Sequence, residues 1–296
     1  MTDSHIRGPA SQNFAAAALK SDLMTLLMPG PRSCEDVGAL EATRAFLRTE
    51  LQSYGYRTEL VRFGEEAGDY NLLAERTGSD PQAPLMEIGA HYDTVRNCPG
   101  ADDNGSGVIG LLALARHFSQ RRLRRTVRFC FFGAEETGLR GSDAHQQLLT
   151  HEGRPFGGCV VFEMIGCRKR EANSQGTPVR IPLLLWPPRT GDFIASVTNW
   201  RSRHLASAYR VAAGTVQGLK VFPVRQLGGL LQEAMRSDHA SYWRAGRPAI
   251  MLTDTAEFRN PHYHRPGDTV ETVDFEFIAE VTWATAVMAE DWAVAQ

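Results

Sequence analysis

The sequence has little cysteine, and what it has is not arranged as a framework. Five cysteines are scattered over 296 residues, and no two of them form a CxxC pair. This excludes a small disulfide-stapled domain and a cysteine zinc site. Cys130 and Cys159 lie in apolar, strand-like runs, which favours small core residues.

Long hydrophobic runs and an excess of charge of one sign are also missing. The longest apolar runs are too short to span a bilayer, and residues 1–20 lack the charged and apolar regions of a secretory signal. The formal net charge is -2, which indicates neither a nucleic-acid nor a membrane partner. The basic cluster at residues 121–125 is typical of a solvated turn. We therefore expect a cytoplasmic protein of unknown oligomeric state, with secretion as an alternative.

The sequence does contain a regular alternation of strand-like and helix-like segments. Apolar residues at helical spacing predict helices over residues 15–28, 37–51, 104–118, 142–149, 192–208, 238–245 and 275–293. Apolar or alternating runs predict strands over residues 57–63, 70–74, 85–90, 126–132, 158–162, 181–186, 219–224 and 248–252. This order is typical of a three-layer α/β/α fold with a central mixed, mostly parallel sheet. No linker or repeat divides the chain, so we expect a single domain over residues 1–296.

Three of the predicted strands lead into ionisable side chains. His91, the pair Glu135–Glu136 and Glu163 each stand at or just beyond the end of an apolar run. Ligands of open α/β sheets collect at the carboxyl ends of the strands, so these side chains are expected to meet. Neighbouring side chains on an extended backbone face opposite sides, so one of the two glutamates could hold a metal while the other moves protons.

Two loop segments add further candidates. One contributes Asp102 or Asp103, and the other contributes His264, with His262 as its rival two residues earlier. A set of nitrogen and oxygen ligands without thiolate suits zinc, cobalt or manganese. Five ligands are too many for one catalytic zinc, and they suit two metals that share a bridging carboxylate.

Several segments resemble the signatures of metallopeptidase family 28, which comprises two-zinc aminopeptidases and their carboxypeptidase relatives. They are Gly89–Asp93, Pro99–Gly107, Phe132–Ser142, Phe162–Gly166, Ser237–Ala240 and Asn260–His264. Each segment alone is a weak signal, but together they follow the family's order from about residue 37 to residue 289. The resemblance implies a zinc exopeptidase-like fold and two Zn²⁺ ions per chain, or Co²⁺ or Mn²⁺ in their place.

The resemblance also implies a role for each ligand. His91 and Glu163 would hold one metal. Glu136 and His264 would hold the other, and Asp102 would bridge the two. The choice of the first of the two adjacent aspartates rests on the family pattern alone, because the spacing leaves it open.

The same resemblance assigns the residues around the metals. Glu135 would be the general base, and Asp93 would orient the histidine two residues before it. Tyr263 would stabilise the oxyanion. A cis peptide bond would join Asp102 to Asp103.

The implied chemistry is hydrolysis of a peptide bond by an activated water. Two metals about 3.5–4 Å apart polarise a shared water and the scissile carbonyl. Glu135 accepts the proton and returns it to the leaving amine. We expect an aminopeptidase, with a carboxypeptidase or dipeptidase of the same family as the alternative.

Two alternatives come from other functional classes. A glutaminyl cyclase is a single-zinc relative, but cyclases lack the counterpart of His91. A non-catalytic binding domain on the same scaffold would have lost ligands or the base, and this chain keeps all six positions. Both readings are therefore less favoured than a peptidase.

Other positions stay open at the level of sequence. Residues from about 167 to 235 are expected to line or cover the specificity pocket. Their large apolar side chains are candidates for pocket or core: Trp186, Phe193, Trp200, Phe222, Leu230 and Leu231. Asp238 could cap a helix or approach the substrate. Arg259 could hold a substrate carboxylate or form a structural salt bridge, and Asp268 could orient His264.

Overall fold

The computed structural model describes residues 14–177, 186–225 and 232–294. Its strands are β1 (Thr58–Arg62), β2 (Tyr70–Arg76), β3 (Leu85–His91), β4 (Val127–Phe132), β5 (Phe156–Glu163), β6 (Ile194–Thr198), β7 (Val221–Arg225) and β8 (Ala249–Thr253). Its α-helices are α1 (Ala16–Leu27), α2 (Val37–Ser53), α3 (Gly107–Phe118), α4 (Arg140–Glu152), α5 (Arg203–Ala213), α6 (His239–Arg244) and α7 (Phe275–Val294). Of the predicted strand over residues 181–186, residues 181–185 lie outside the described ranges.

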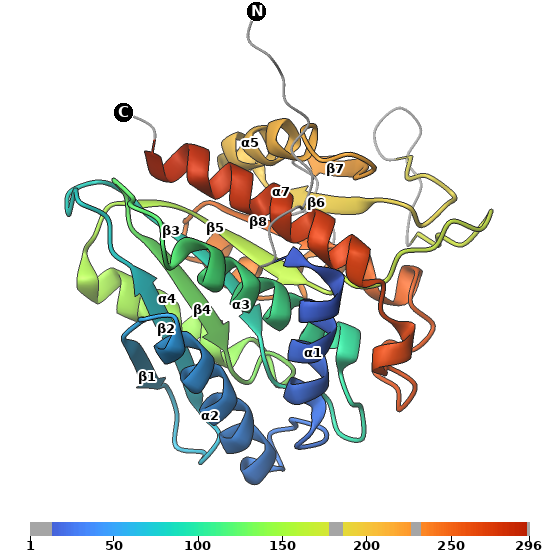
Figure 1. Cartoon of the computed structure of the whole chain (residues 1–296), viewed down its shortest axis with the longest axis horizontal. Helices are drawn as coiled ribbons and strands as arrows, with labels where there is room; N and C mark the ends of the chain where they lie inside the picture. The colour runs from blue at the N-terminus through green and yellow to red at the C-terminus, as the bar shows by residue number, and fades with distance from the viewer. Residues whose placement is uncertain (1–13, 178–185, 226–231, 295–296) are drawn as a thin grey trace, which may run out of the picture.

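The strands form one mixed sheet in the order β1-β2-β4-β3-β5-β8-β6-β7 (Figure 1). The neighbours β1–β2, β2–β4 and β6–β8 are antiparallel. The central strands β4, β3, β5 and β8 are parallel to one another, as are β6 and β7. The predicted α/β/α fold with a largely parallel sheet is confirmed, while the extent of a single domain over the whole chain stays a prediction.

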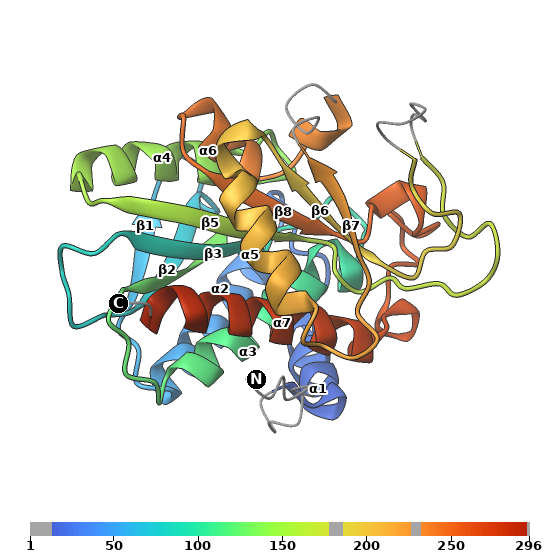
Figure 2. The ribbon, with the colours of Figure 1, turned by 90° about the horizontal axis from the view of Figure 1, so that it is seen from above.

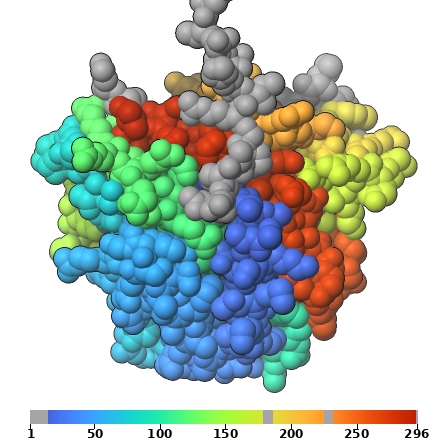
Figure 3. Space-filling model, in the orientation of Figure 1, coloured from blue at the N-terminus to red at the C-terminus, as the bar shows by residue number. Residues whose placement is uncertain are grey.

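Helices cover both faces of this sheet (Figure 2). On one face α3 packs against β3, β4 and β5, with α1, α2 and α7 beside it, and α5 packs against α7. Only Arg116 of α3 is not buried, as expected for a helix enclosed on all sides. In the space-filling view, α1 and α2 lie side by side on that face (Figure 3). On the other face α4 packs against α6.

The helix predicted over residues 192–208 is wrong, because the segment divides into β6 and α5. Ile194, Val197 and Thr198 are β-branched and suit a strand that is buried between two neighbours. Asn199 then ends the strand, and its side-chain oxygen accepts a hydrogen bond from the backbone N–H of Ser202 at 3.0 Å. A cap of this kind starts a helical turn, so the helix begins later than its apolar spacing suggested.

The basic segment at residues 121–125 is a turn held by ion pairs. Arg121 lies 3.2 Å from Glu290, and Arg124 lies 3.1 Å from Asp80. These pairs agree with the predicted solvated turn. Among the described residues, no helix combines the length and hydrophobicity that crossing a membrane requires.

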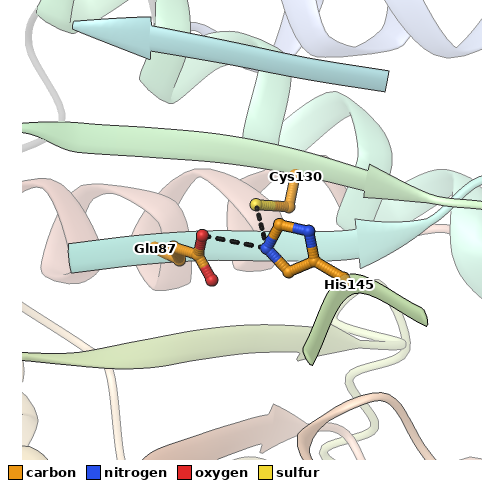
Figure 4. A group of neighbouring side chains, drawn as sticks. All are labelled: Glu87, Cys130 and His145. Atoms are coloured by element: carbon orange, nitrogen blue, oxygen red, sulfur yellow. Dashed lines mark hydrogen bonds and ion pairs between the residues drawn. The ribbon is translucent and has the colours of Figure 1, made fainter. Parts of the chain in front are cut away.

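The five cysteines are free thiols, and Cys130 belongs to a polar network inside the sheet. Its sulfur and the carboxylate of Glu87 both face Nε2 of His145, at 3.8 Å and 2.9 Å (Figure 4). The buried Glu87 also accepts hydrogen bonds from Nη1 of Arg128 at 3.1 Å and from the hydroxyl of Tyr242 at 2.7 Å. These donors already satisfy and neutralise the carboxylate, so the network is structural rather than a metal site.

Glu87→Gln is expected to destabilise the fold by about 3 kcal/mol at neutral pH, because it removes a buried carboxylate that pairs with Arg128 and is hydrogen-bonded to Tyr242 and His145. Burial alone would raise the pKa of Glu87, but His145, Arg128 and Tyr242 lower it to about 2. A lowered pKa stabilises the fold fully above the ordinary value of about 4.3, and this stabilisation is lost as the pH falls toward 2. Urea denaturation at pH 7 and pH 3.5 should show the wild type losing more stability on acidification than the variant.

Glu290→Gln is the matched control, since Glu290 also pairs with a histidine, His117, and an arginine, Arg121, but is partly exposed. It should cost less than about 1 kcal/mol. Equal losses for the two variants would refute the special role of the buried carboxylate.

Candidate metal centre

The ionisable side chains meet at one edge of the parallel sheet. His91 ends β3, Glu163 ends β5, and Glu135 and Glu136 follow β4. Because β3 lies between β4 and β5 and is parallel to both, their carboxyl ends converge at the same place. These four side chains therefore lie at neighbouring strand ends, as the sequence pattern led us to expect.

Asp103 lies between the two histidines and offers one carboxylate oxygen to each. Its Oδ1 is 3.4 Å from Nε2 of His91, and its Oδ2 is 3.1 Å from Nε2 of His264. Each histidine also faces a glutamate. His91 lies 3.5 Å from Oε2 of Glu163, and His264 lies 3.1 Å from Oε2 of Glu136. Two groups of ligand atoms thus share one carboxylate.

Asp102 does not occupy the bridging position that the family pattern was taken to imply. Its Oδ1 accepts a hydrogen bond from the N–H of Gly166 at 2.9 Å, and its Oδ2 accepts one from Nδ2 of Asn260 at 2.7 Å. Both oxygens are thus engaged away from the histidines. The cis peptide bond is also one residue further on, between Asp103 and Asn104.

Residues outside the ligand set hold the loop that carries Asp103 in place. The carboxylate of Asp268 accepts the backbone N–H groups of Asp102 and Asp103 at 2.9 Å and 3.0 Å. Arg32 is fully buried and donates to the carbonyls of Tyr92, Pro99 and Gly100. Gly100 has φ of 67°, and a Cβ there would lie 2.4 Å from the carbonyl oxygen of Asp103. Only glycine fits this turn, which brings the aspartate into the site.

Asp93 supports both sides of the centre. The ring nitrogen Nδ1 of His91 lies 3.2 Å from the backbone carbonyl of Asp93 and 3.6 Å from its carboxylate. The two carboxylate oxygens accept the N–H groups of Glu135 and Glu136, each at 3.1 Å. Its carboxylate therefore orients the glutamate pair, and its main chain contacts the histidine.

The crowded carboxylates raise one another's proton affinity. Burial, the charge of Asp103 and other neighbours raise the pKa of Glu136 to about 7. Burial raises the pKa of Glu135 well above its ordinary value against the opposing charge of His91, and Glu163 adds to the rise. Burial alone would lower the pKa of His264, but Asp103 and Glu136 raise it to about 10. Such a cluster is costly without added positive charge.

The donor set fits divalent cations. Oδ2 of Asp103 and Oε1 of Glu136 are buried oxygens without a hydrogen bond among the described residues. Donor atoms of His91, Glu135 and Glu163 lie within 4.8 Å of one another, as do those of His91, Asp103 and Glu136. Imidazole and carboxylate donors without thiolate suit zinc and related ions.

Tyr263 and His264 lie at the entrance of the centre. Their rings stack with centroids 3.9 Å apart. The hydroxyl oxygen of Tyr263 accepts a hydrogen bond from Nη2 of Arg236 at 2.8 Å. The next residue, Ser237, donates to Oε2 of Glu163 at 2.5 Å. The sequence motif included Ser237, but nothing in the pattern indicated that it or Arg236 would contact the site.

Three positions that sequence left open lie outside the centre. Asp268 holds the aspartate loop and makes no hydrogen bond to His264 in the described structure. Arg259 is buried and donates to Gln175 and to two backbone carbonyls, so it anchors neighbouring segments. Asp238 precedes α6 without a capping bond, and burial raises its pKa to about 7.

A cavity of about 440 Å³ opens beside the ligand atoms. Its far wall is apolar and is formed by β6, β7 and β8, with Phe193 and Phe222 on it. Both were candidates for a pocket. Trp186 and Trp200 are exposed at 59% and 61% and are not among the lining residues. Leu230 and Leu231 lie outside the described residues.

The chain is similar to known proteins in both sequence and fold. The profile of peptidase family M28 matches residues 71–289. The uncharacterized protein YfbL of Escherichia coli (strain K12) is 34% identical over 265 residues, which cover 85% of this chain and 80% of YfbL. A probable leucine aminopeptidase 1 of Trichophyton verrucosum is 26% identical over 239 residues, which cover 76% of this chain and 58% of that protein.

A solved structure shows the same fold. The LapA aminopeptidase of Legionella pneumophila superposes with a TM-score of 0.78 at 23% identity, covering 95% of this chain and 73% of that one. The family profile covers well over half of this chain, and the resemblance predicted from its motifs is confirmed. The chain belongs to peptidase family M28 and is a metal-dependent peptidase.

Proposed function

We propose that the chain is an aminopeptidase that uses two divalent cations, which are Zn²⁺ or, as alternatives, Co²⁺ or Mn²⁺. The observation that carries this proposal is the position of Asp103, whose two oxygens face the two histidines at 3.4 Å and 3.1 Å. One carboxylate shared by two groups of ligands is what a two-metal site requires.

The ligands divide into two sets around that carboxylate. His91 and Glu163 would hold one cation, and Glu136 and His264 would hold the other. Asp103 would serve both. This assignment keeps every ligand expected from the motifs except Asp102, whose oxygens are engaged elsewhere.

The residues around the ligands supply the remaining chemistry. Bound divalent cations would lower the pKa of a water and polarise the scissile carbonyl. Glu135 accepts the proton of the attacking water and passes it to the leaving amine. Tyr263 donates a hydrogen bond to the oxygen on which negative charge develops.

The charge of the cavity favours recognition of a free amine. Beyond the proposed ligands and the proposed base, two of the described lining residues carry carboxylates, Glu233 and Glu257. Arg236 also lines the cavity, but its guanidinium is ion-paired with Glu257. An α-ammonium group is better matched to this surface than a free carboxylate. The aminopeptidase named among the relatives is in keeping with this choice.

Removal and restoration of metal tests the proposal. Chelator-treated protein should lose hydrolysis of aminoacyl substrates, and Zn²⁺ should restore it with an end point at two equivalents per chain. N-blocked versions of the same substrates are the control and should stay uncleaved. Saturation at one equivalent together with cyclisation of N-terminal glutamine would favour a cyclase, and no metal-dependent hydrolysis at all would refute the proposal.

A further inference from the structure

Arg236 forms a link between the cavity wall and the tyrosine at the centre. One guanidinium nitrogen, Nη1, is ion-paired with Oε1 of Glu257. The other, Nη2, donates to the hydroxyl oxygen of Tyr263 at 2.8 Å. All three side chains line the cavity. Arg236 therefore touches both a residue of the wall and a residue proposed to touch the reacting carbonyl.

Two side chains lie against the ring of Tyr263. One side stacks on His264 with centroids 3.9 Å apart and planes 22° apart. The guanidinium carbon of Arg236 lies 5.7 Å from the ring centroid. Stacking sets the plane of the ring, while the hydrogen bond from Arg236 sets the direction in which the hydroxyl can act.

A phenol that accepts a hydrogen bond from a cation becomes a stronger donor. Arg236 occupies one lone pair of the Tyr263 oxygen, so the O–H must point in another direction. The positive charge polarises the O–H bond, and hydrogen bonds in a chain strengthen one another. A donor oriented before the reaction stabilises a developing oxyanion without reorganisation.

We propose that Arg236 is a positioning residue that orients and polarises the hydroxyl of Tyr263 for oxyanion stabilisation, with Glu257 holding the guanidinium in place. The proposal rests on the proposed peptidase function. Direct capture of a substrate carboxylate by Arg236 is the competing role. The ion pair with Glu257 and the hydrogen bond to Tyr263 argue against it, because they engage both terminal nitrogens of the guanidinium.

A double-mutant cycle between Arg236 and Tyr263 tests the coupling. Arg236→Met should lower kcat about tenfold with KM little changed, because it acts only on the transition state. Tyr263→Phe should lower kcat by about 100-fold as an oxyanion donor is lost. In the Tyr263→Phe background, Arg236→Met should have almost no further effect. Arg236→Lys should recover part of kcat, since it keeps the charge without the planar fork.

A readout other than turnover comes from inhibitor binding. An aminoalkyl boronic acid imitates the tetrahedral anion, and its affinity should fall in Arg236→Met by the same factor as kcat/KM. Affinity for a free amino acid such as leucine, which has the form of an aminopeptidase product but lacks that geometry, should not change. Glu257→Gln should lower boronate affinity and kcat/KM by a smaller factor. This variant provides a second test if Arg236→Met does not fold.

Arg244→Met is the matched control. The side chain of Arg244 on α6 is 46% exposed, as is that of Arg236. Arg244 is ion-paired with Asp143 on α4, and neither residue lines the cavity. It should leave kcat and boronate affinity unchanged. Additive losses in the cycle would overturn the proposal, and so would a rise in KM confined to substrates with a free carboxylate. A wild type without metal-dependent peptidase activity would overturn the proposed function as well, so the two failures are distinguishable.

Discussion

Glu135→Gln is expected to lower kcat by about 10³-fold while the protein keeps its bound metal. Donor atoms of Glu135, His91 and Glu163 lie within 4.8 Å of one another. The two sets of ligands proposed around Asp103, however, do not include Glu135. Glutamine preserves the shape of the side chain and cannot accept a proton. The loss should therefore appear in kcat and leave metal affinity close to that of the wild type.

Glu136→Gln is the contrasting variant, since the two residues are adjacent and only one faces His264. It should lose metal, with activity falling as a consequence. Elemental analysis of both proteins beside steady-state kinetics separates the two roles. If Glu135→Gln lost metal and Glu136→Gln kept it, the division of tasks between the glutamates would have to be exchanged.

Asp103→Asn is expected to abolish activity and remove metal from both positions, while Asp102→Asn should retain metal. Each oxygen of Asp103 faces a different histidine, so an amide in its place removes the negative charge that both sets share and replaces one oxygen with an NH2 group that cannot bind a cation. The oxygens of Asp102 accept from Gly166 and Asn260 instead. The cost of Asp102→Asn should therefore appear in thermal stability.

Zinc content, kcat and the melting temperature of both variants decide between the aspartates. Asp103→Asn should contain well below one equivalent of zinc with a melting temperature near that of metal-free wild type. Asp102→Asn should bind two equivalents and melt several degrees lower, about what a loss of 1–2 kcal/mol produces. Metal loss in Asp102→Asn alone would restore Asp102 as the bridge.

Much of the fold could be read from local patterns. The runs at β3, β4 and β5 are short, apolar and bounded by turn residues, and the parallel order of these strands followed from the helices between them. The segment containing β6 was misread because Ala195, Ser196 and Ala206 fit a helix as readily as a strand. Pairing with β7 and β8 selects the strand there, and that pairing is not a local property.

The site was predictable as a set of residue types at strand ends, and less so atom by atom. Asp102 and Asp103 are identical in chemistry and adjacent in sequence. Which one turns toward the histidines depends on Gly100, on Asp268 and on the hydrogen bonds that engage Asp102. Arg32 and Arg236 were missed for a similar reason, since an arginine in a loop has no local signature of what it contacts.

The sequence by itself determined the chemistry available to this protein: histidines and carboxylates without thiolate, placed where parallel strands end, in the order of peptidase family M28. Only the tertiary structure decided which aspartate lies between the histidines and which arginine contacts Tyr263. The physical reason is the distance along the chain between the residues that interact. Strand and helix patterns arise between neighbours in the chain, whereas Asp103 and His264, or Arg236 and Tyr263, meet only after the sheet has brought distant loops to the same edge.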